Sequence, residues 1–442
     1  MINGLRRSPQ WILSVAGICA CCWVARIEAS SDEKTTTERV VRSNWASFRG
    51  PNGDGHSPEI DLPLRWGPSE NLTWKLDLPG VGASSPVLWN DRIFLTATTD
   101  KGWKRLLLCI NRTDGSIRWQ QVVSTGDPGP THAMNQHASS TCVTDGDRVW
   151  SFFGKGGLFC HDFDGRLIWE RRIGDFLSVW GTAASPILHR DKLIVNCDQD
   201  TMLQKEPDPD TPSKAFLAAV DKNTGKTIWQ TPRAASRGWS TPVALRQPDG
   251  RDELVLNGPD GVHGYDPESG RDLWVYRREV KFGEPCIVAG HGLMFAISGR
   301  PGPMFAIRQG SGEGDRTDKA KAWGDNRNAR DITSPILVGD ELYTATMTGI
   351  GTCYDARTGE IRWRERMGKG YTASPVLADG KIYFVSRDGQ ATVLEPGAKY
   401  SVLAVNQLDP QQNEDFLASP AVSNGQIFLR SDRVLYCVGI QR

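Results

Sequence analysis

Residues 354–363 read Tyr354-Asp355-Ala356-Arg357-Thr358-Gly359-Glu360-Ile361-Arg362-Trp363. They combine an acidic residue, a glycine four positions later and a tryptophan four positions after that. The same spacing recurs in three further full copies: Asn111/Gly115/Trp119, Asp221/Gly225/Trp229 and Asp266/Gly270/Trp274. A β-rich flank, a turn cluster ending in Gly and an alternating run are typical of a hairpin between antiparallel strands. The chain is therefore predicted to repeat one β unit.

Each repeat has a second landmark, a Ser-Pro pair or a variant of it that opens a short apolar strand, as in Ser85-Pro86-Val87. The eight landmarks have their second residue at positions 86, 141, 186, 242, 285, 335, 375 and 420. The steps between them are 55, 45, 56, 43, 50, 40 and 45 residues, the range of a four-stranded propeller blade. The spacing predicts eight blades, and seven remain an alternative because the fifth and seventh units are weak.

The repeated glycine and tryptophan have separate structural roles. Glycine supplies a positive φ angle at the turn, and tryptophan is large enough to wedge between adjacent blades. The residues assigned to these roles are Trp74, Trp119, Trp169, Trp229, Trp274, Trp323, Trp363, Gly115, Gly225, Gly270 and Gly359. The copy at residues 162–169 is one residue shorter before its glycine, the fifth unit keeps only its tryptophan, and the seventh has none.

Closure of the ring is also predicted by spacing. The last unit ends near Val438 without a tryptophan strand, while residues 72–76 form an isolated strand before the first landmark. The step from Trp74 to Pro86 is 12 residues, as is that from Trp363 to Pro375. The amino-terminal strand is therefore expected to be the outer strand of the last blade, which removes the free edges. The predicted fold is an all-β, eight-bladed propeller of four-stranded antiparallel blades, occupying residues 45–442.

The amino terminus reads as a targeting segment. Arg6 and Arg7 precede an apolar run over residues 11–25, with a cleavage point after Ala29. We expect a signal peptide at residues 1–29, a polar linker at 30–44 and an exported, periplasmic or cell-envelope protein without a membrane span after cleavage. An uncleaved anchor and lipidation at Cys21 are the alternatives.

Charge and cysteine content exclude several classes. Lys+Arg and Asp+Glu are both 52 in 442 residues, so nothing favours nucleic acid as a partner. Of ten cysteines, three lie in the targeting segment. The remaining seven contain no adjacent pair and no Cys-x-x-Cys, so neither a disulfide framework nor a metal site is predicted. Their apolar surroundings indicate buried small side chains.

The motif Asp-x-x-Thr-Gly-x-x-x-Trp, present at residues 221–229 and 355–363, resembles the PQQ-like propeller repeats. These repeats occur in quinoprotein alcohol dehydrogenases and in an outer-membrane-protein assembly lipoprotein. The resemblance covers about residues 45–439 and implies the propeller fold without implying a single function.

A resemblance to the enzymes of this family would require specific residues at the cofactor site. The resemblance to them implies adjacent disulfide-bonded cysteines over the quinone, a calcium ion held by Glu, Asn and Asp, and an Asp base. The adjacent cysteines here are Cys21 and Cys22, inside the targeting segment, and no haem-attachment Cys-x-x-Cys-His occurs. No cofactor is therefore expected, and PQQ with calcium belongs to the alternative, a PQQ-dependent quinoprotein oxidoreductase.

A long loop supplies the first candidate ligand-binding residues. The gap between Trp119 and the second landmark is 22 residues, where the minimal repeat has 12, and it contains His132, Asn135 and His137. Loops of this length in a compact fold are often functional. The other interpretation is that the histidines hydrogen-bond the loop to the propeller face.

Further candidates lie near the strand openings. Asp198 belongs to an acidic, Pro-rich region, where a calcium site and a solvated loop are the two interpretations. Arg237 and Trp239 come just before a landmark, as do Phe282 and Glu284, so their side chains could reach the central channel.

The sequence favours an exported, non-enzymatic propeller that acts as a binding scaffold for a protein or another component of the cell envelope. The quinoprotein oxidoreductase is the opposing class. A carbohydrate-acting or sugar-binding module is a third, which would need paired carboxylates or stacking aromatic side chains that project into the channel.

Overall fold

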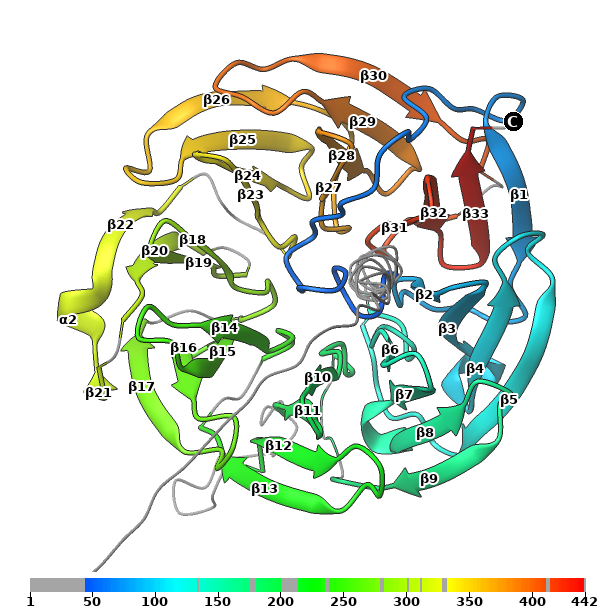
Figure 1. Ribbon diagram of the computed structural model, residues 1–442, viewed down its shortest axis with the longest axis horizontal. Coiled ribbons are helices and arrows are strands. Elements are labelled where there is room, and N and C mark those ends of the chain that lie inside the picture. Colours follow the sequence, from blue (N-terminus) through cyan, green and yellow to red (C-terminus); the bar gives the residue numbers. More distant parts are fainter. Residues whose placement is uncertain are drawn as a thin grey trace, which may run out of the picture. The chain divides into compact units, whose positions relative to one another are not determined.

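The computed structural model describes residues 44–132, 135–174, 176, 178, 180–199, 214–234, 238–278, 282–299, 302–310, 312–327, 332–410 and 414–440. Its strands form eight sheets around a central channel, so the predicted eight-bladed propeller is confirmed (Figure 1). The predicted signal peptide, and all of the predicted linker except Asn44, lie outside the described residues.

Blades are numbered here from the first complete one, with strands given from the channel outward. Blade 1 contains β2 (Val87–Trp89), β3 (Arg92–Thr99), β4 (Lys104–Asn111) and β5 (Ile117–Thr125). Blade 2 contains β6 (Val143–Thr144), β7 (Arg148–Phe152), β8 (Leu158–Asp162) and β9 (Leu167–Arg171). Blade 3 contains β10 (Ile187–His189), β11 (Lys192–Cys197), β12 (Phe216–Asp221) and β13 (Thr227–Pro232). Blade 4 contains β14 (Val243–Arg246), β15 (Asp252–Gly258), β16 (Gly261–Tyr265), β17 (Asp272–Arg277) and a fifth, parallel strand, β21 (Gly314–Asp315).

The second half of the ring follows the same order. Blade 5 contains β18 (Val288–Gly290), β19 (Leu293–Ile297), β20 (Met304–Arg308) and β22 (Lys321–Asp325). Blade 6 contains β23 (Ile336–Val338), β24 (Glu341–Ala345), β25 (Ile350–Asp355) and β26 (Ile361–Arg366). Blade 7 contains β27 (Val376–Ala378), β28 (Lys381–Val385), β29 (Gln390–Leu394) and β30 (Val402–Gln407). Blade 8 contains β31 (Ala421–Ser423), β32 (Gln426–Arg430), β33 (Val434–Gly439) and β1 (Leu72–Asp77). The helical turns are η1 (Asp100–Gly102), η2 (Gly154–Gly156) and α2 (Thr317–Ala320).

The ring closes as the spacing predicts. Strand β1 pairs antiparallel with β33, and Trp74 lies opposite Cys437. Blade 8 therefore joins the two ends of the propeller through backbone hydrogen bonds, and no free edge remains between the first blade and the last.

Two of the predicted landmark positions are wrong. In six blades the first strand begins one residue after the landmark, but β6 begins at Val143 and β18 at Val288. Positions 141 and 285 are therefore one and two residues too early. Cys142 and Ile287 occupy the structural position instead, and neither is a proline that the sequence pattern could identify.

Neighbouring blades are joined by the repeated tryptophan. The indole N–H of Trp119 in blade 1 donates to the backbone carbonyl of Phe163 in blade 2 at 2.8 Å, and Trp169 makes the same bond to Lys222 at 3.0 Å. Each ring also lies against the turn glycine of the next blade, so that a Cβ added at Gly225 would lie 2.7 Å from the Trp169 ring. Trp74, Trp229, Trp323 and Trp363 donate in the same way to the following blade.

The irregular copies have structural reasons. Blade 5 lacks the Asp-to-Gly turn, so Trp274 bonds Glu253 of its own blade at 2.8 Å and is covered by the guanidinium of Arg316, 5.0 Å from its ring. Blade 7 needs no tryptophan, because blade 8 has no turn between its outer two strands, which come from opposite ends of the propeller.

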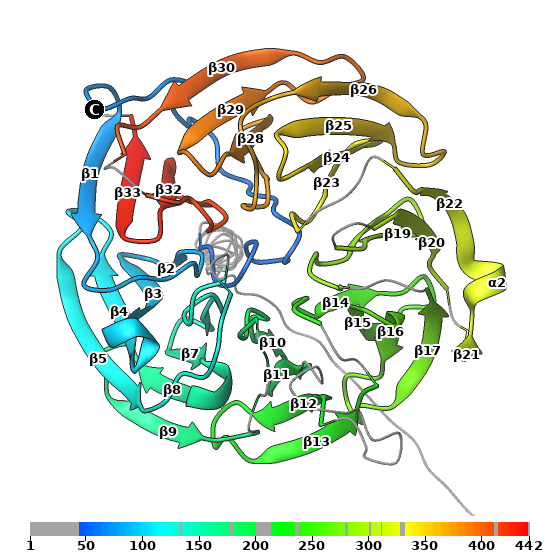
Figure 2. The same cartoon turned by 180° about the vertical axis from the view of Figure 1, so that it is seen from behind.

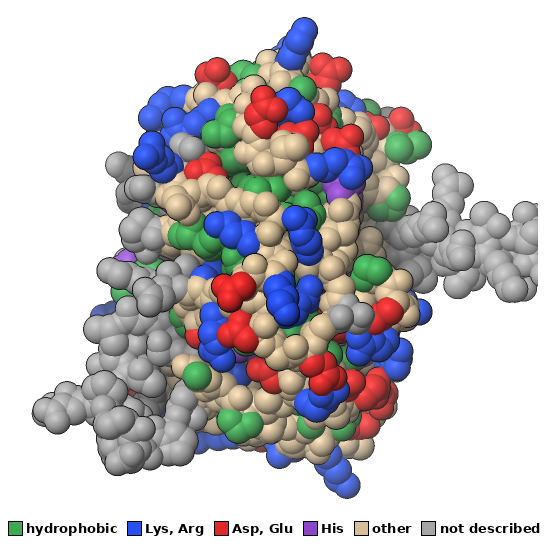
Figure 3. Space-filling view, turned by 90° about the vertical axis from the view of Figure 1, so that its left-hand side faces the viewer, with side chains coloured by type: hydrophobic (Ala, Val, Ile, Leu, Met, Phe, Trp, Pro, Cys, Tyr) green, Lys and Arg blue, Asp and Glu red, His purple; other side chains and the backbone are tan. Residues whose placement is uncertain are grey.

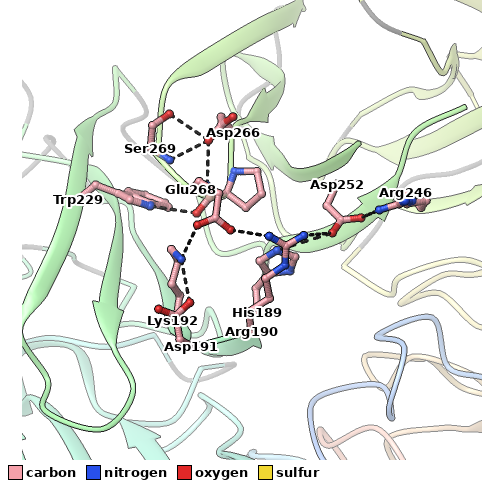
Figure 4. Close-up of polar contacts among 11 residues, drawn as sticks. His189, Arg190, Asp191, Lys192, Trp229, Arg246, Asp252, Asp266, Glu268 and Ser269 are labelled. Carbon is pink, nitrogen blue, oxygen red and sulfur yellow. Dashed lines mark hydrogen bonds and ion pairs between the residues drawn. The ribbon is translucent and has the colours of Figure 1, made fainter. Parts of the chain in front are cut away.

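Ion pairs reinforce the contact between blades 3 and 4 (Figure 4). Lys192, whose side chain is 6% exposed, contacts Glu268 at 2.7 Å, and Arg190 contacts the same carboxylate at 2.9 Å. Glu268 belongs to the turn onto which Trp229 packs, through a bond to the carbonyl of Pro267. The charged contacts therefore hold the turn that receives the tryptophan.

The segment before β1 crosses the centre of the ring (Figures 1 and 2). Trp45 exchanges backbone hydrogen bonds with Leu88 of blade 1, and Leu377 of blade 7 bonds Gly55 and Ser57. Arg49 is buried and donates to the carbonyls of Asp54 and Pro335 at 2.7 and 2.8 Å. The segment is thus anchored to the channel wall at blades 1, 6 and 7.

The tryptophan contact predicts the effect of a methyl group at the turn. Gly225 and Gly380 have similar φ angles, +70° and +67°, but no atom lies within 4 Å of a Cβ at Gly380. We expect Gly380→Ala to lower stability by about 1 kcal/mol through backbone strain alone. Gly225→Ala should lower it by about 2–4 kcal/mol, because the Trp169 ring must also move. Denaturant midpoints measure the difference, and equal losses in both variants would show that the contact does not tie the blades.

Candidate functional site

The channel wall carries a ring of hydroxyl groups, one at the start of each first strand in all blades except the fifth. The ring hydroxyls belong to Ser85, Thr141, Ser185, Thr241, Ser334, Ser374 and Ser419. Each accepts a hydrogen bond from a backbone N–H of the preceding blade, and the seven donor–acceptor distances lie between 2.9 and 3.1 Å. We call this set the hydroxyl ring. It ties the inner ends of the blades together, as the tryptophans tie the outer ends.

The hydroxyl ring is interrupted between blades 4 and 5. Cys286 stands where the other blades have Ser or Thr, and a thiol is a weak acceptor. The side-chain amide of Asn257 in blade 4 bridges the gap, donating to the carbonyls of Pro285 and Ile297 at 2.8 and 2.9 Å. Ser240 also donates to Pro285 at 3.0 Å. This interface is therefore held by amide and hydroxyl side chains from blade 4.

The hydroxyl ring forms part of the wall of a cavity of about 270 Å³ in the channel, which we call the cup. The residues described around it include Phe48, His132, Asn135, Trp180, Trp239, Phe282, Glu284, Ile332 and Leu417. Phe48, from the crossing segment, also lines a second cavity of about 340 Å³ beside that segment. Phe48 therefore stands between the two cavities.

Four aromatic side chains follow one another along the cup, and we call them the aromatic arc. The ring centres of His132 and Trp180 are 4.3 Å apart, those of Trp180 and Phe282 are 6.3 Å apart, and those of Phe282 and Trp239 are 6.1 Å apart. The members lie in the connections between blades 1 and 2, 2 and 3, 3 and 4, and 4 and 5. The aromatic arc thus takes one side chain from each of four consecutive connections.

Hydrogen bonds fix the connections that carry the aromatic arc. The indole N–H of Trp239 donates to the carbonyl of Gly181 at 2.9 Å, and the side-chain amide of Asn135 donates to the carbonyl of Trp180 at 2.6 Å. Thr131 donates to the same carbonyl at 3.2 Å. Consecutive connections are therefore bonded to one another.

The structure brings three of the predicted ligand-binding residues together at the cup: His132, Asn135 and Trp239. His137 lines an adjacent cavity of about 320 Å³ and lies against Gly102. Burial lowers the pKa of His137, and the charge of Arg105 adds to this effect. Arg237 lies outside the described residues.

Asp198 is placed in a buried ion pair and is not among the residues that line the cup. Its carboxylate accepts from Nε of Arg233 at 2.7 Å, and the two side chains are 0% and 2% exposed. Burial raises the pKa of Asp198, while the charge of Arg233 opposes the rise. This arrangement satisfies the carboxylate inside the protein and gives Asp198 a structural contact.

Sequence reasoning did not select Trp180 or Phe48, and it noted Phe282 and Glu284 only as channel-facing positions. Trp180 could have been selected by its position in the sequence. It lies a few residues before a first strand, as Trp239 and Phe282 do. Phe48 carried no such signal, because its place depends on the path of the segment across the channel.

The cysteines and the acidic groups bear on the residues that the resemblance to quinoprotein enzymes implies. The seven cysteines are buried free thiols, as predicted, and burial raises the pKa of Cys109 to about 12. No group of three or more His, Cys, Asp and Glu side chains among the described residues is arranged to hold a metal ion.

A protein-family model described as outer membrane protein assembly factor BamB matches residues 67–202, 213–313 and 312–409. The chain belongs to this family. The BamB protein of Legionella pneumophila (strain Paris) is 23% identical over 187 residues, which are 41% of this chain and 46% of that relative. The match therefore spans less than half the length of this curated relative.

Solved structures agree in fold. BamB from Moraxella catarrhalis superposes with a TM-score of 0.56 at 16% identity, covering 84% of this chain and 98% of that one. A quinohemoprotein alcohol dehydrogenase from Comamonas testosteroni gives a TM-score of 0.68 at 11% identity, covering 92% of this chain and 83% of that one. At these identities the likeness concerns the propeller alone.

The hydroxyl ring predicts a difference between two substitutions at one position. Ser374→Ala removes the acceptor of the Ser334 N–H and should lower stability by about 1–3 kcal/mol, because a buried donor is left unpaired. Ser374→Thr keeps the hydroxyl, as Thr141 and Thr241 do in their blades, and should stay within about 1 kcal/mol of the native chain. Denaturant unfolding measures both. Equal losses would mean that the hydroxyl does not tie the blades.

Proposed function

We propose that this chain is an exported, non-enzymatic propeller that binds a protein partner in the assembly of outer membrane proteins. Membership of the BamB family supports a role in outer membrane protein assembly, since the family model is described as an outer membrane protein assembly factor. Residues 1–29, read as a signal peptide, support export. Within the described residues, no helix has the length and apolar character required to cross a bilayer.

The observation that carries the proposal is the edge of β5. It is the longest outer strand, nine residues, and it exposes Ile117 by 39% and Val122 by 52%. An outer strand has one edge without a neighbouring strand, and such edges accept an extended segment of another protein. Exposed apolar side chains next to the edge add contact area for that segment.

Blade 4 supports strand addition at an outer edge. Strand β21 pairs in parallel with β17, with Trp274 opposite Gly314 and Val275 opposite Asp315. The added strand comes from the excursion within blade 5. The outer edge of a blade in this propeller therefore accommodates a further strand, and we propose that β5 receives one from the partner.

Charge supports a protein partner over nucleic acid. On the side of the wall seen in Figure 3, Lys and Arg side chains are interspersed with Asp and Glu. The chain as a whole has 52 of each sign. Phosphate backbones are bound by concentrated positive charge, and neither the composition nor this side supplies it.

Site-specific photo-crosslinking tests the β5 edge. A crosslinking amino acid at Val122 should capture a component of the outer-membrane assembly machinery in intact cells, identified by mass spectrometry. The same amino acid at Ile361, 39% exposed on the outer strand of blade 6, is the matched control. We expect the adduct at Val122 to be at least about tenfold stronger. Equal capture at both positions, or none, would contradict the proposal.

The absence of a quinone cofactor is part of the proposal, and it is tested separately. Calorimetric titration of the mature chain with PQQ and calcium should give no saturable heat, because the described residues contain no group of three or more His, Cys, Asp and Glu side chains that could hold a metal ion. A dye-coupled alcohol oxidation assay should give no turnover. Saturable binding with turnover would make the protein a quinoprotein oxidoreductase instead.

A further inference from the structure

The cup presents aromatic surface and hydrogen-bonding groups to the same space. The members of the aromatic arc, His132, Trp180, Phe282 and Trp239, are all half-buried and all line the cavity. The bonds from Trp239 to Gly181 and from Asn135 to Trp180 hold the connections in place without a ligand. The aromatic surface is therefore preorganised, which reduces the entropy lost on binding.

The hydroxyl ring has unused hydrogen-bonding capacity. A hydroxyl group has one donor and two acceptor sites, and each ring hydroxyl uses one acceptor site for a backbone N–H. Among the described residues, no hydrogen bond is donated by the hydroxyls of Ser185, Ser374 or Ser419, which all line the cup. Donors and acceptors are thus both available to a ligand at this wall.

This combination matches the chemistry of a saccharide. A pyranose ring has an apolar C–H face, which packs on the electron-rich face of an aromatic ring, and a perimeter of hydroxyls that donate and accept. The charged residue among the described cup residues is Glu284, so a neutral ligand fits better than an anionic one. The volume of about 270 Å³ is near the lower end of ligand pockets, roughly 300–1,000 Å³, and suits a terminal one or two sugar rings.

We propose that the cup is a binding site for the end of a neutral saccharide. An apolar side chain inserted by a protein partner would also cover the aromatic arc, but it would leave the ring hydroxyls unpaired on burial. A saccharide would pack its C–H face on the aromatic arc and would also form hydrogen bonds with the ring hydroxyls. The cup shares no residue with the β5 edge, so the saccharide proposal can be correct or wrong independently of the proposed protein partner.

Titration of the mature chain with cellobiose, maltose and N,N′-diacetylchitobiose tests the site, read by tryptophan fluorescence and calorimetry. At least one disaccharide should bind saturably. Trp180→Ala should weaken that binding about tenfold or more, because a stacking surface is lost. Trp103→Ala is the matched control, since Trp103 is 53% exposed near η1 and is not a cup residue; its affinity should be unchanged.

A second variant protects the test against misfolding. Ala183 lines the cup, and Ala183→Trp fills the cavity without removing any contact of the aromatic arc. It should abolish saccharide binding while the thermal midpoint stays within a few degrees of the native value. Three outcomes would overturn the proposal: no binding of any of the three disaccharides, binding unaffected by both cup variants, or equal loss in Trp103→Ala.

Discussion

The packing of a tryptophan from one blade onto the glycine turn of the next is the contact on which the ring depends. The turn needs glycine for two reasons, a positive φ angle and the space that the indole occupies, as at Gly225 beneath Trp169. The indole N–H then binds a carbonyl of the same turn, which fixes the angle between the blades. Six of the eight blades contact the next blade in this way, and β1 closes the ring by completing blade 8.

The hydroxyl ring also joins neighbouring blades, at the inner ends of the blades. Both sets of contacts are interrupted at the interface of blades 4 and 5, where Cys286 replaces a hydroxyl and Trp274 has no glycine turn to meet. Asn257 and Arg316 supply replacement contacts there. The strand addition by β21 and one member of the aromatic arc, Phe282, belong to the same part of the ring. The residues that depart from the repeat therefore lie in the part of the ring that also carries the additional strand β21 and the arc residue Phe282.

The fold could be predicted well because its determinants are local and repeated. Blade number, strand order within a blade and closure by residues 72–76 all follow from spacing between turn glycines, tryptophans and strand openings. The errors fell on the second and fifth blades, where no Ser-Pro pair marks the strand. The candidate site was predicted in part. His132 and Trp239 lie at the cup, but Asp198, chosen for its acidic neighbours, is neutralised by Arg233, which is 35 residues away in the chain.

The sequence by itself determined the repeating unit, since each turn and strand depends on residues within a few positions of one another. Tertiary structure alone decided which connections meet at the channel, because the members of the aromatic arc are separated by whole blades in sequence. It also decided that Phe48 stands between two cavities, since the path of its segment is set by contacts with blades 1 and 7. Closing a ring brings distant loops to a common axis, and no local pattern records which side chains then face one another.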